Sequence, residues 1–168
     1  FSWAAIGRQY SKLFARVIKD KELPSYTQTV PKILKVGKRQ MIGQQIIGVL
    51  RQFLGKNNLQ KRKNLTCLDI GCSTGVITNI LNNHFKKVIG IDVDRKALDI
   101  AWKKYQKNNL TFKVMDSLNL DFKNNQFNVV ILNQVYEFVN DQEKLVQEVY
   151  RVLKKGGICF VGARNKLT

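Results

Sequence analysis

The chain has 168 residues, of which 44% are hydrophobic and 24% are charged, so it is long enough for one globular domain with a substantial core. No apolar run approaches the roughly 18 residues of a membrane span, and the short opening FSWAAI lacks the basic flank of a signal peptide. The first residue is Phe, so we expect the sequence to be part of a longer protein.

The net charge is +17, and the basic residues are concentrated in the first third of the chain. Residues 1–64 carry 14 Lys and Arg against two acids, a net charge of +12, whereas residues 65–168 carry +5. Such a segment can bind nucleic acid, an anionic membrane surface or an acidic substrate. A solvated lysine-rich surface without a partner is an equal alternative.

The number and spacing of the cysteines and histidines argue against a domain held together by zinc or by disulfides. There are three cysteines, Cys67, Cys72 and Cys159, with no CxxC pair, and His84 is the single histidine. This set excludes a Cys/His zinc site and argues against a disulfide framework. Buried thiols in a reducing compartment are the favoured interpretation, so we expect a cytoplasmic protein without a bound metal.

The first part of the chain is predicted to be helical. Residues 3–19 place an apolar stripe on one helix face and basic residues on the other. We expect that stripe to pack against its own domain or a neighbouring chain, the alternative being a helix in the plane of an anionic membrane. Residues 24–31, bracketed by the two prolines, form an extended connector, and residues 38–54 a second amphipathic helix. Residues 1–64 are therefore predicted as a basic helical leader that packs on the rest.

From residue 65 to residue 168 the pattern changes to alternating strands and helices. Continuous apolar strands separated by helices indicate a parallel sheet covered on both faces, and right-handed crossovers make it a doubly wound, Rossmann-like α/β sandwich of three layers. Trp102 and Tyr105 lie on one of the helices, and we expect them to serve packing rather than base stacking. Strands are predicted over residues 65–70, 87–92, 110–114, 127–132 and 158–163, and helices over 75–83, 95–107 and 141–153.

The loop at residues 71–75 has the sequence GCSTG and follows the first strand of this region. Ligands of such sheets bind at the carboxyl ends of the strands, where this loop lies. Gly71 and Gly75 permit a tight turn and a close backbone approach, and the next helix offers free N–H groups. The loop lacks the third glycine of a dinucleotide site and the Gly-Lys-Ser/Thr of a phosphate-binding P-loop.

Three acids stand at the ends of three successive strands. Asp69 precedes the glycine loop and suits a cationic ligand. Asp92 can accept hydrogen bonds from both hydroxyls of a ribose, and Asp116 is placed to accept one from an adenine amino group. Each acid alone could cap a turn, but together with the loop they predict a nucleoside-like ligand that carries positive charge.

These motifs resemble the class I S-adenosylmethionine (SAM)-dependent methyltransferases over about residues 63–163. LDIGCSTG resembles the first motif, with Ser73 in place of the usual middle glycine, and FNVVILNQVYEFV resembles the fourth. IDVD and MDSL match the ribose-binding and adenine-contacting acids of the family. The segment before strand five is resembled by YRVLKKGGICFVGARN. The leader of some small bacterial methyltransferases resembles YTQTVPKILKVGKRQ. The resemblance implies SAM as cofactor, bound by Asp69, Gly71, Cys72, Ser73, Gly75, Asp92, Val93, Asp116, Ser117 and Asn133.

The resemblance also implies the reaction, an in-line transfer of a methyl group from the sulfonium to a nucleophile. The expected acceptor is a small molecule, a lipid or a cell-envelope precursor. One alternative is an RNA methyltransferase that uses the basic leader, although no RNA-binding motif is recognisable. Another is a non-catalytic module that binds SAM, which the intact motif acids disfavour.

The fourth motif leaves the catalytic residue unassigned. Asn133 ends its strand, where the resemblance places the methyl group. Related sequences often carry a His after the motif's glutamate, but here Glu137 is followed by Phe138, which weakens a mechanism relying on that histidine. Glu137 is a candidate base, but we favour a solvated acid close to the start of the helix at 141–153.

The family's sheet has seven strands, and this sequence stops shortly after the fifth. The resemblance predicts strand order 3-2-1-4-5 with strands six and seven absent. The fifth strand would then be an open hydrophobic edge, which invites pairing with another chain. We therefore expect self-association at this edge and little methyl transfer by these 168 residues alone.

Overall fold

The computed structural model describes residues 37–54 and 64–162, which belong to the unit Val36–Thr168. The helix predicted over residues 3–19, the connector at 24–31 and nearly all of the basic loop at 55–64 lie outside the described residues. For these segments, and for the leader at 1–64 as a whole, the sequence expectations stay predictions.

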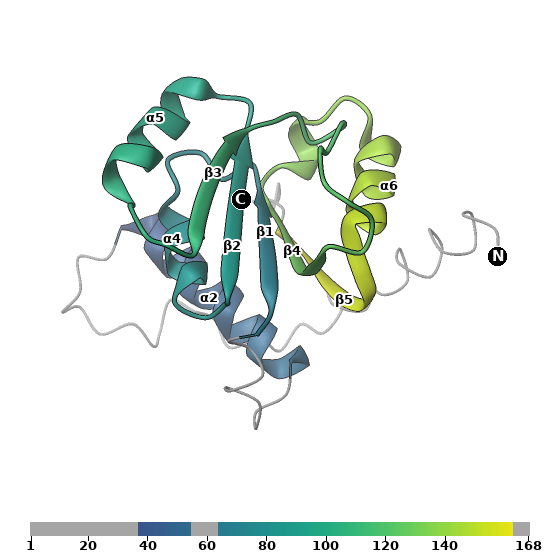
Figure 1. Cartoon of the computed structure of the whole chain (residues 1–168), viewed down its shortest axis with the longest axis horizontal. Helices are drawn as coiled ribbons and strands as arrows, with labels where there is room; N and C mark the ends of the chain where they lie inside the picture. The colour runs from purple at the N-terminus through teal and green to yellow at the C-terminus, as the bar shows by residue number, and fades with distance from the viewer. Residues whose placement is uncertain (1–36, 55–63, 163–168) are drawn as a thin grey trace, which may run out of the picture. The chain divides into compact units, whose positions relative to one another are not determined.

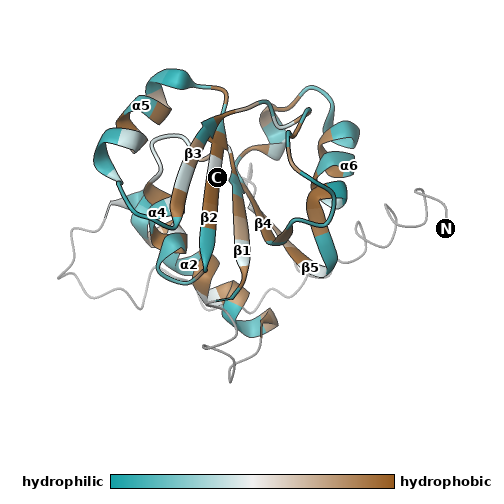
Figure 2. Cartoon of the chain, in the orientation of Figure 1, coloured by the Kyte–Doolittle hydropathy of each residue, from teal (hydrophilic) through white to brown (hydrophobic). Residues whose placement is uncertain are grey.

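Five parallel strands form one sheet in the order β3-β2-β1-β4-β5, which confirms the predicted doubly wound fold (Figure 1). In the centre of the sheet, Leu68 pairs with Ile89 on one side and with Val130 on the other. Hydrophobic residues dominate these central strands, because both faces of the sheet are covered (Figure 2). The strands are β1 Thr66–Ile70, β2 Lys87–Asp92, β3 Leu110–Val114, β4 Phe127–Asn133 and β5 Leu153–Gly162.

The helices divide the core into two layers, one on each face of the sheet. Successive residues of β1 point to opposite faces, so Cys67 packs in the cluster with α2 and α4, whereas Leu68 packs in the cluster with α6. Asp94 begins α5 by accepting hydrogen bonds from two backbone N–H groups, and Asp141 begins α6 in the same way with one. The helices are α2 Lys38–Phe53, α4 Val76–Asn82, α5 Arg95–Lys104 and α6 Gln142–Val152, with a 3₁₀ turn η1 at Tyr136–Phe138.

Helix α2 lies against α4 through its apolar face. A Cβ on Gly43 would come within 2.6 Å of Ile80 Cδ1, so the two helices approach closely at this glycine. Ile46 and Leu50 are buried beneath the helix, as its periodicity predicts. Phe53, in contrast, is the last residue of the helix and is 65% exposed. The second predicted helix is thus part of the same unit as the sheet.

Strand β5 begins earlier than the sequence pattern predicts. It follows α6 directly at Leu153, and the glycine turn expected before it is an irregular part of the strand. Between the pairs Phe127–Leu153 and Val129–Ile158, β4 advances by two residues and β5 by five. Gly156 has a φ of +75° in this bulge, a conformation that glycine adopts at low cost.

Candidate functional site

The glycine loop leaves the carboxyl end of β1 and turns back toward β2. Gly71 and Gly75 both have left-handed backbone, with φ of +72° and +74°. A Cβ on Gly71 would overlap Val135, which follows β4, so only glycine fits between these two segments. The N–H groups of Gly71 and Cys72 both donate to the carbonyl of Ile91, at 2.8 and 3.0 Å. The loop is therefore fixed to the end of β2.

Asp92, the last residue of β2, holds the middle of this loop. The backbone N–H of Ser73 donates to Asp92 Oδ2 at 2.7 Å, and that of Asp94 donates to Oδ1 at 2.9 Å. Each carboxylate oxygen has a second lone pair, so Asp92 can accept further hydrogen bonds from a ligand. Ser73 itself has a φ of +49°, so the residue that replaces the motif's usual glycine keeps a left-handed conformation.

Asp69 is a buried acid directly beneath the loop. Its side chain is 2% exposed, and Thr78 Oγ1 of α4 donates to Asp69 Oδ2 at 2.7 Å. Burial raises the pKa of the Asp69 carboxyl to about 7, with a smaller contribution from the charge of Asp92, and the hydrogen bond from Thr78 opposes the shift. No cationic side chain pairs with Asp69 among the described residues. A bound cation would favour its ionised form.

The side chain of Arg39 contacts the glycine loop, and the sequence analysis did not predict this contact. This first-turn residue of α2 donates from Nη1 to Ser73 Oγ at 3.1 Å and to Thr74 Oγ1 at 3.3 Å. The quoted leader sequence includes Arg39, but nothing in the periodicity of α2 indicates that its exposed side chain reaches a loop 34 residues away. The structure thus adds a guanidinium to the set of predicted site residues.

A cavity of about 240 Å³ lies between these groups. It collects charged and polar groups from four parts of the chain: α2, the end of β1, the glycine loop and the end of β4. The acid and the guanidinium contribute opposite charges to one small space, as a ligand with both an ammonium and a carboxylate group requires. Its lining includes Arg39, Asp69, Gly71, Ser73, Asn133 and Phe138.

The ten predicted cofactor residues fall into two sets. Five line the cavity, namely Asp69, Gly71, Cys72, Ser73 and Asn133. The other five do not line it: Gly75 is the N-cap of α4, Asp92 holds the loop, Val93 is 69% exposed, and Asp116 and Ser117 lie in the turn after β3.

Asp116 organises its own turn in the structure. Its carboxylate accepts from the backbone N–H of Leu118 at 2.9 Å and from Asn119 Nδ2 at 3.4 Å. It is exposed at the carboxyl end of the sheet, next to the strand that ends in Asp92. The cofactor role of these ten residues stays a prediction.

The expectation of a solvated Glu137 is wrong. Both of its carboxylate oxygens are buried, and neither has a hydrogen-bond partner among the described residues. Glu137 lies in the 3₁₀ turn η1, before α6 begins, and not in the first turn of that helix. A carboxylate without a partner is unfavourable when buried, so a donor from outside the described residues would stabilise it.

The cysteines are free, and their thiols are held neutral. Burial raises the pKa of Cys159 to about 12, and burial with the nearby charges of Asp69 and Asp92 raises that of Cys72 well above its ordinary value. Within residues 37–54 and 64–162, no cluster of His, Cys, Asp and Glu could hold a metal ion. No helix in the same part of the chain is long and apolar enough to cross a membrane.

The sequence matches one protein family, described as a methyltransferase domain, over residues 68–161. The matched segment covers more than half of the chain and runs from β1 to β5, so it includes the glycine loop and the strand-end acids. The family match therefore includes the site residues described above except Arg39, which lies in α2 before the matched segment.

Two curated relatives have names that refer to quinone biosynthesis. The chain is 31% identical over 120 residues to a ubiquinone biosynthesis O-methyltransferase of Pelagibacter ubique, an alignment that covers 70% of this chain and 50% of the relative. It is 33% identical over 94 residues to a ubiquinone/menaquinone biosynthesis C-methyltransferase of Desulfotalea psychrophila, covering 55% and 38%. The chain thus spans half or less of the length of these relatives.

A solved structure shares the fold. The YcgJ protein of Bacillus subtilis superposes with a TM-score of 0.60 at 22% identity, covering 69% of this chain and 49% of that one. At this identity the superposition supports the Rossmann-like architecture, and the family assignment comes from the sequence match.

Proposed function

The chain belongs to the class I SAM-dependent methyltransferases, and from this premise we propose that it transfers the methyl group of SAM to a small-molecule acceptor. The observation that carries the proposal is the cavity between Asp69 and Arg39, at the carboxyl end of β1. It offers a buried acid without a cationic partner and a guanidinium without an acidic one, among the described residues.

These two side chains fit the amino-acid end of SAM. Asp69 would face the ammonium group and the sulfonium, and Arg39 would bind the carboxylate with a charge-assisted hydrogen bond. The backbone of Gly71 allows a close approach, because a side chain there has no space. The amino-acid end of SAM therefore fits the donors and acceptors of the cavity.

The nucleoside end of SAM would extend along the neighbouring strands. Asp92 would accept from the ribose hydroxyls with its remaining lone pairs, with Val93 alongside, and Asp116 with Ser117 would contact the adenine. SAM would thereby lie across the carboxyl ends of β1, β2 and β3.

Transfer of the methyl group needs mainly positioning, because the sulfonium is already activated. The acceptor's lone pair would attack the methyl carbon in line with the C–S bond, and the sulfur would keep the bonding electrons. Holding the two reactants in this orientation can supply up to roughly 7–11 kcal/mol of the barrier reduction. Asn133 and Phe138 line the cavity on the β4 side, where the acceptor would approach.

We propose that Glu137 takes the proton when the acceptor loses one. Its buried carboxylate lacks a described partner, and it lies in the turn that places Phe138 at the cavity. A hydroxyl or amine of the acceptor would supply the missing donor and then its proton. Replacement of Glu137 by Gln should lower kcat while the affinity for SAM is retained, and an unchanged kcat would remove the residue from the mechanism.

The acceptor is proposed to be a small molecule or lipid precursor rather than RNA. The names of the two relatives refer to quinone biosynthesis, which supports this class. The RNA methyltransferase and the non-catalytic SAM-binding module remain the alternatives. A cytoplasmic location is proposed from the free cysteines, which suit a reducing compartment.

Calorimetric titration with SAM and with its demethylated product tests the cofactor. We expect binding of both to the wild type and at least tenfold weaker binding to Asp69→Asn and to Arg39→Gln, since each loses a charge-assisted hydrogen bond. Equal affinities in the wild type and both variants would contradict the cavity assignment. Incubation of cell fractions with methyl-labelled SAM then reports the acceptor class, with extraction into solvent expected for a lipid precursor.

A further inference from the structure

The amino-end surface, meaning the described segments at the starts of β2, β3, β4 and β5, carries basic side chains and no acidic ones. All five strands are parallel, so their amino ends lie at one edge of the sheet, together with the ends of the helices that lead into them. The segments 83–88, 103–111, 123–128 and 153–157 contain no acidic residue. Their eight lysines are Lys86, Lys87, Lys103, Lys104, Lys107, Lys123, Lys154 and Lys155, all exposed.

None of these lysines takes part in either of the two ion pairs formed by the described residues. Lys107 and Lys154 donate to the amides of Asn83 and Asn128, at 3.4 and 3.3 Å, which leaves their charge uncompensated. Lys103 and Lys104 lie in the last turn of α5, where their positive charge complements the helix dipole. Lys86 and Lys87, at the start of β2, are outside any helix and have no such role.

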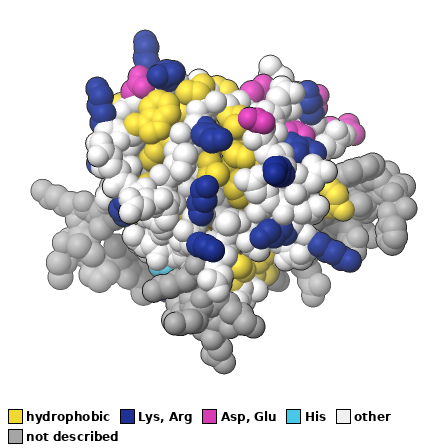
Figure 3. Space-filling view, in the orientation of Figure 1, with side chains coloured by type: hydrophobic (Ala, Val, Ile, Leu, Met, Phe, Trp, Pro, Cys, Tyr) yellow, Lys and Arg dark blue, Asp and Glu magenta, His cyan; other side chains and the backbone are white. Residues whose placement is uncertain are grey.

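The opposite edge of the sheet has a different character. The segments that follow the strands contain Asp92, Asp94, Asp116, Asp141 and Glu143. In the face shown in Figure 3, acidic side chains appear only in the upper part, toward the carboxyl ends, whereas Lys and Arg appear in both the upper and the lower part. Basic side chains without nearby acids are therefore found at the edge away from the proposed SAM site.

An aromatic hollow lies within the same surface. A cavity of about 540 Å³ is lined by Trp102, Tyr105, Lys107 and Asn108, between the end of α5 and the start of β3. Both side chains pack against the core, as expected, but they are only half-buried and also line the hollow. Trp102 Nε1 donates to the carbonyl of Phe112 at 3.2 Å. Lys104 Nζ lies 5.4 Å from the centre of the Tyr105 ring. Aromatic rings at a hollow with lysines beside it, here Lys104 and Lys107, are typical of sites that bind single-stranded nucleic acid.

We propose that the amino-end surface binds a single-stranded nucleic acid, with lysines on its phosphates and an unstacked base in the hollow beside Tyr105. A membrane surface fits less well, because interfacial binding needs apolar side chains that project outward, and both aromatic rings here are anchored in the core. The strand would bind away from the cavity that holds Asp69, so it is an anchoring partner and not the methyl acceptor. The inference does not depend on the proposed methyl transfer.

Fluorescence anisotropy of the full 168-residue chain with a short labelled single-stranded RNA tests this proposal. The variant Lys86→Glu/Lys87→Glu reverses charge at the start of β2, and Lys38→Glu/Lys96→Glu reverses the same charge at exposed positions near the opposite edge. We expect at least tenfold weaker RNA binding for the first pair and less than a twofold change for the second. The slope of log affinity against log salt should fall by about 1.4 for the first pair, at about 0.7 per phosphate contact.

Three further results decide the proposal. Tyr105→Leu should weaken binding several-fold with an unchanged salt slope, because it removes stacking and no charge. Equal losses in the two charge-reversal pairs would show that only net charge matters and would overturn the proposal. Tight binding to anionic phosphatidylglycerol vesicles with no RNA binding at physiological salt would also overturn it, in favour of a membrane. Thermal melting of each variant confirms that it is folded.

Discussion

Gly71 shows at the scale of one residue why a position in the motif loop requires glycine. Its φ of +72° is unfavourable for any residue with a Cβ, and a Cβ there would also overlap Val135. Gly48, on the exposed side of α2, has open space around the position of a Cβ and ordinary helical backbone. The two glycines therefore form a matched pair for a single substitution to alanine.

We predict that Gly71→Ala lowers the free energy of unfolding by about 2–4 kcal/mol, the sum of backbone strain and overpacking. Gly48→Ala should raise it by about 1 kcal/mol, since alanine favours the helix. Urea unfolding of both variants provides the measurement. A Gly71→Ala variant as stable as the wild type would show that the loop adopts another conformation.

Asp69 gives the molecule a pH dependence whose sign follows from its environment. The pKa of its carboxyl is about 7 in the folded chain, against an ordinary value of 3.8. Between these values the folded state keeps a proton that the unfolded state has lost, so this residue's contribution to the free energy of unfolding falls as pH rises from about 4 to about 7. Well above pH 7 the carboxyl is ionised in both the folded and the unfolded state, so its contribution no longer changes with pH.

We predict that Asp69→Asn removes this dependence. The difference in unfolding free energy between the wild type and the variant should change by about 2–3 kcal/mol between pH 5 and pH 8, with the wild type relatively less stable at the higher pH. Urea unfolding at the two pH values measures it. Parallel pH profiles would mean that the Asp69 carboxyl titrates as an exposed acid does.

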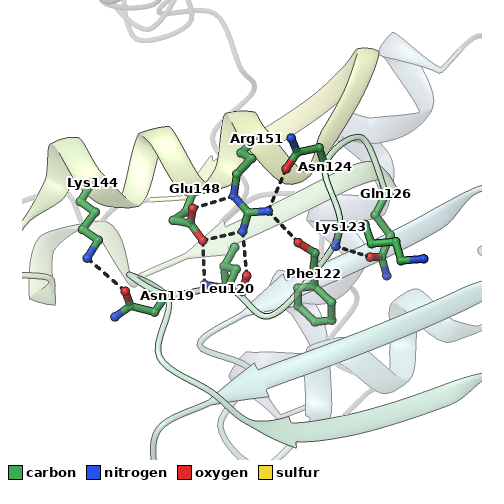
Figure 4. Close-up of polar contacts among 9 residues, drawn as sticks. All are labelled: Asn119, Leu120, Phe122, Lys123, Asn124, Gln126, Lys144, Glu148 and Arg151. Atoms are coloured by element: carbon green, nitrogen blue, oxygen red, sulfur yellow. Dashed lines mark hydrogen bonds and ion pairs between the residues drawn. The ribbon is translucent and has the colours of Figure 1, made fainter.

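At the scale of elements, Arg151 fixes the long loop between β3 and β4 to α6 (Figure 4). Its guanidinium forms a two-point ion pair with Glu148 and donates to the carbonyls of Leu120 and Phe122, at 2.7 and 2.6 Å. Glu148 in turn accepts from the backbone N–H of Leu120 at 2.7 Å. The hydrogen bonds from Arg151 hold the pKa of the Glu148 carboxyl below its ordinary value.

We predict that Arg151→Ala lowers the free energy of unfolding by about 2–4 kcal/mol, because Glu148 and the two carbonyls lose their partner together. Lys144, on the same helix, forms a single exposed hydrogen bond to Asn119 of the same loop (Figure 4). Lys144→Ala should therefore change the stability by less than about 0.5 kcal/mol. If the two variants lost similar amounts of unfolding free energy, the hydrogen bonds of Arg151 would contribute no more stability than the single exposed bond of Lys144.

The sequence predicts most of the elements because their signals are local. The strands at 87–92 and 110–114 agree with the structure to the residue, since an apolar run between polar turns determines each of them. The early start of β5 depends on a bulge against β4, and local periodicity does not report it. The Arg39 contact and the burial of Glu137 arise from segments that meet only in the folded chain. Such tertiary contacts are the part of the site that sequence patterns miss.

At the scale of the whole molecule, the two edges of the sheet differ in how they are protected. The β3 edge is partly blocked, because Trp102 donates to the carbonyl of Phe112. On β5, the exposed side chains of Lys154 and Lys155 disfavour pairing of the first half of the strand with another chain. Residues 158–162 are apolar, and among the described strands they pair only with β4, on one side. Self-association, if driven by strand pairing, should therefore involve residues 158–162.

We predict that the chain self-associates through this segment with increasing concentration. Sedimentation velocity should show a concentration-dependent dimer, because unpaired backbone groups on a hydrophobic edge favour strand addition. Hydrogen exchange should show slower amide exchange in residues 158–162 at high protein concentration, while residues 110–114 at the blocked edge exchange at the same rate at all concentrations. A monomer at every concentration, with unchanged exchange in both strands, would show that the β5 edge is already covered within one chain.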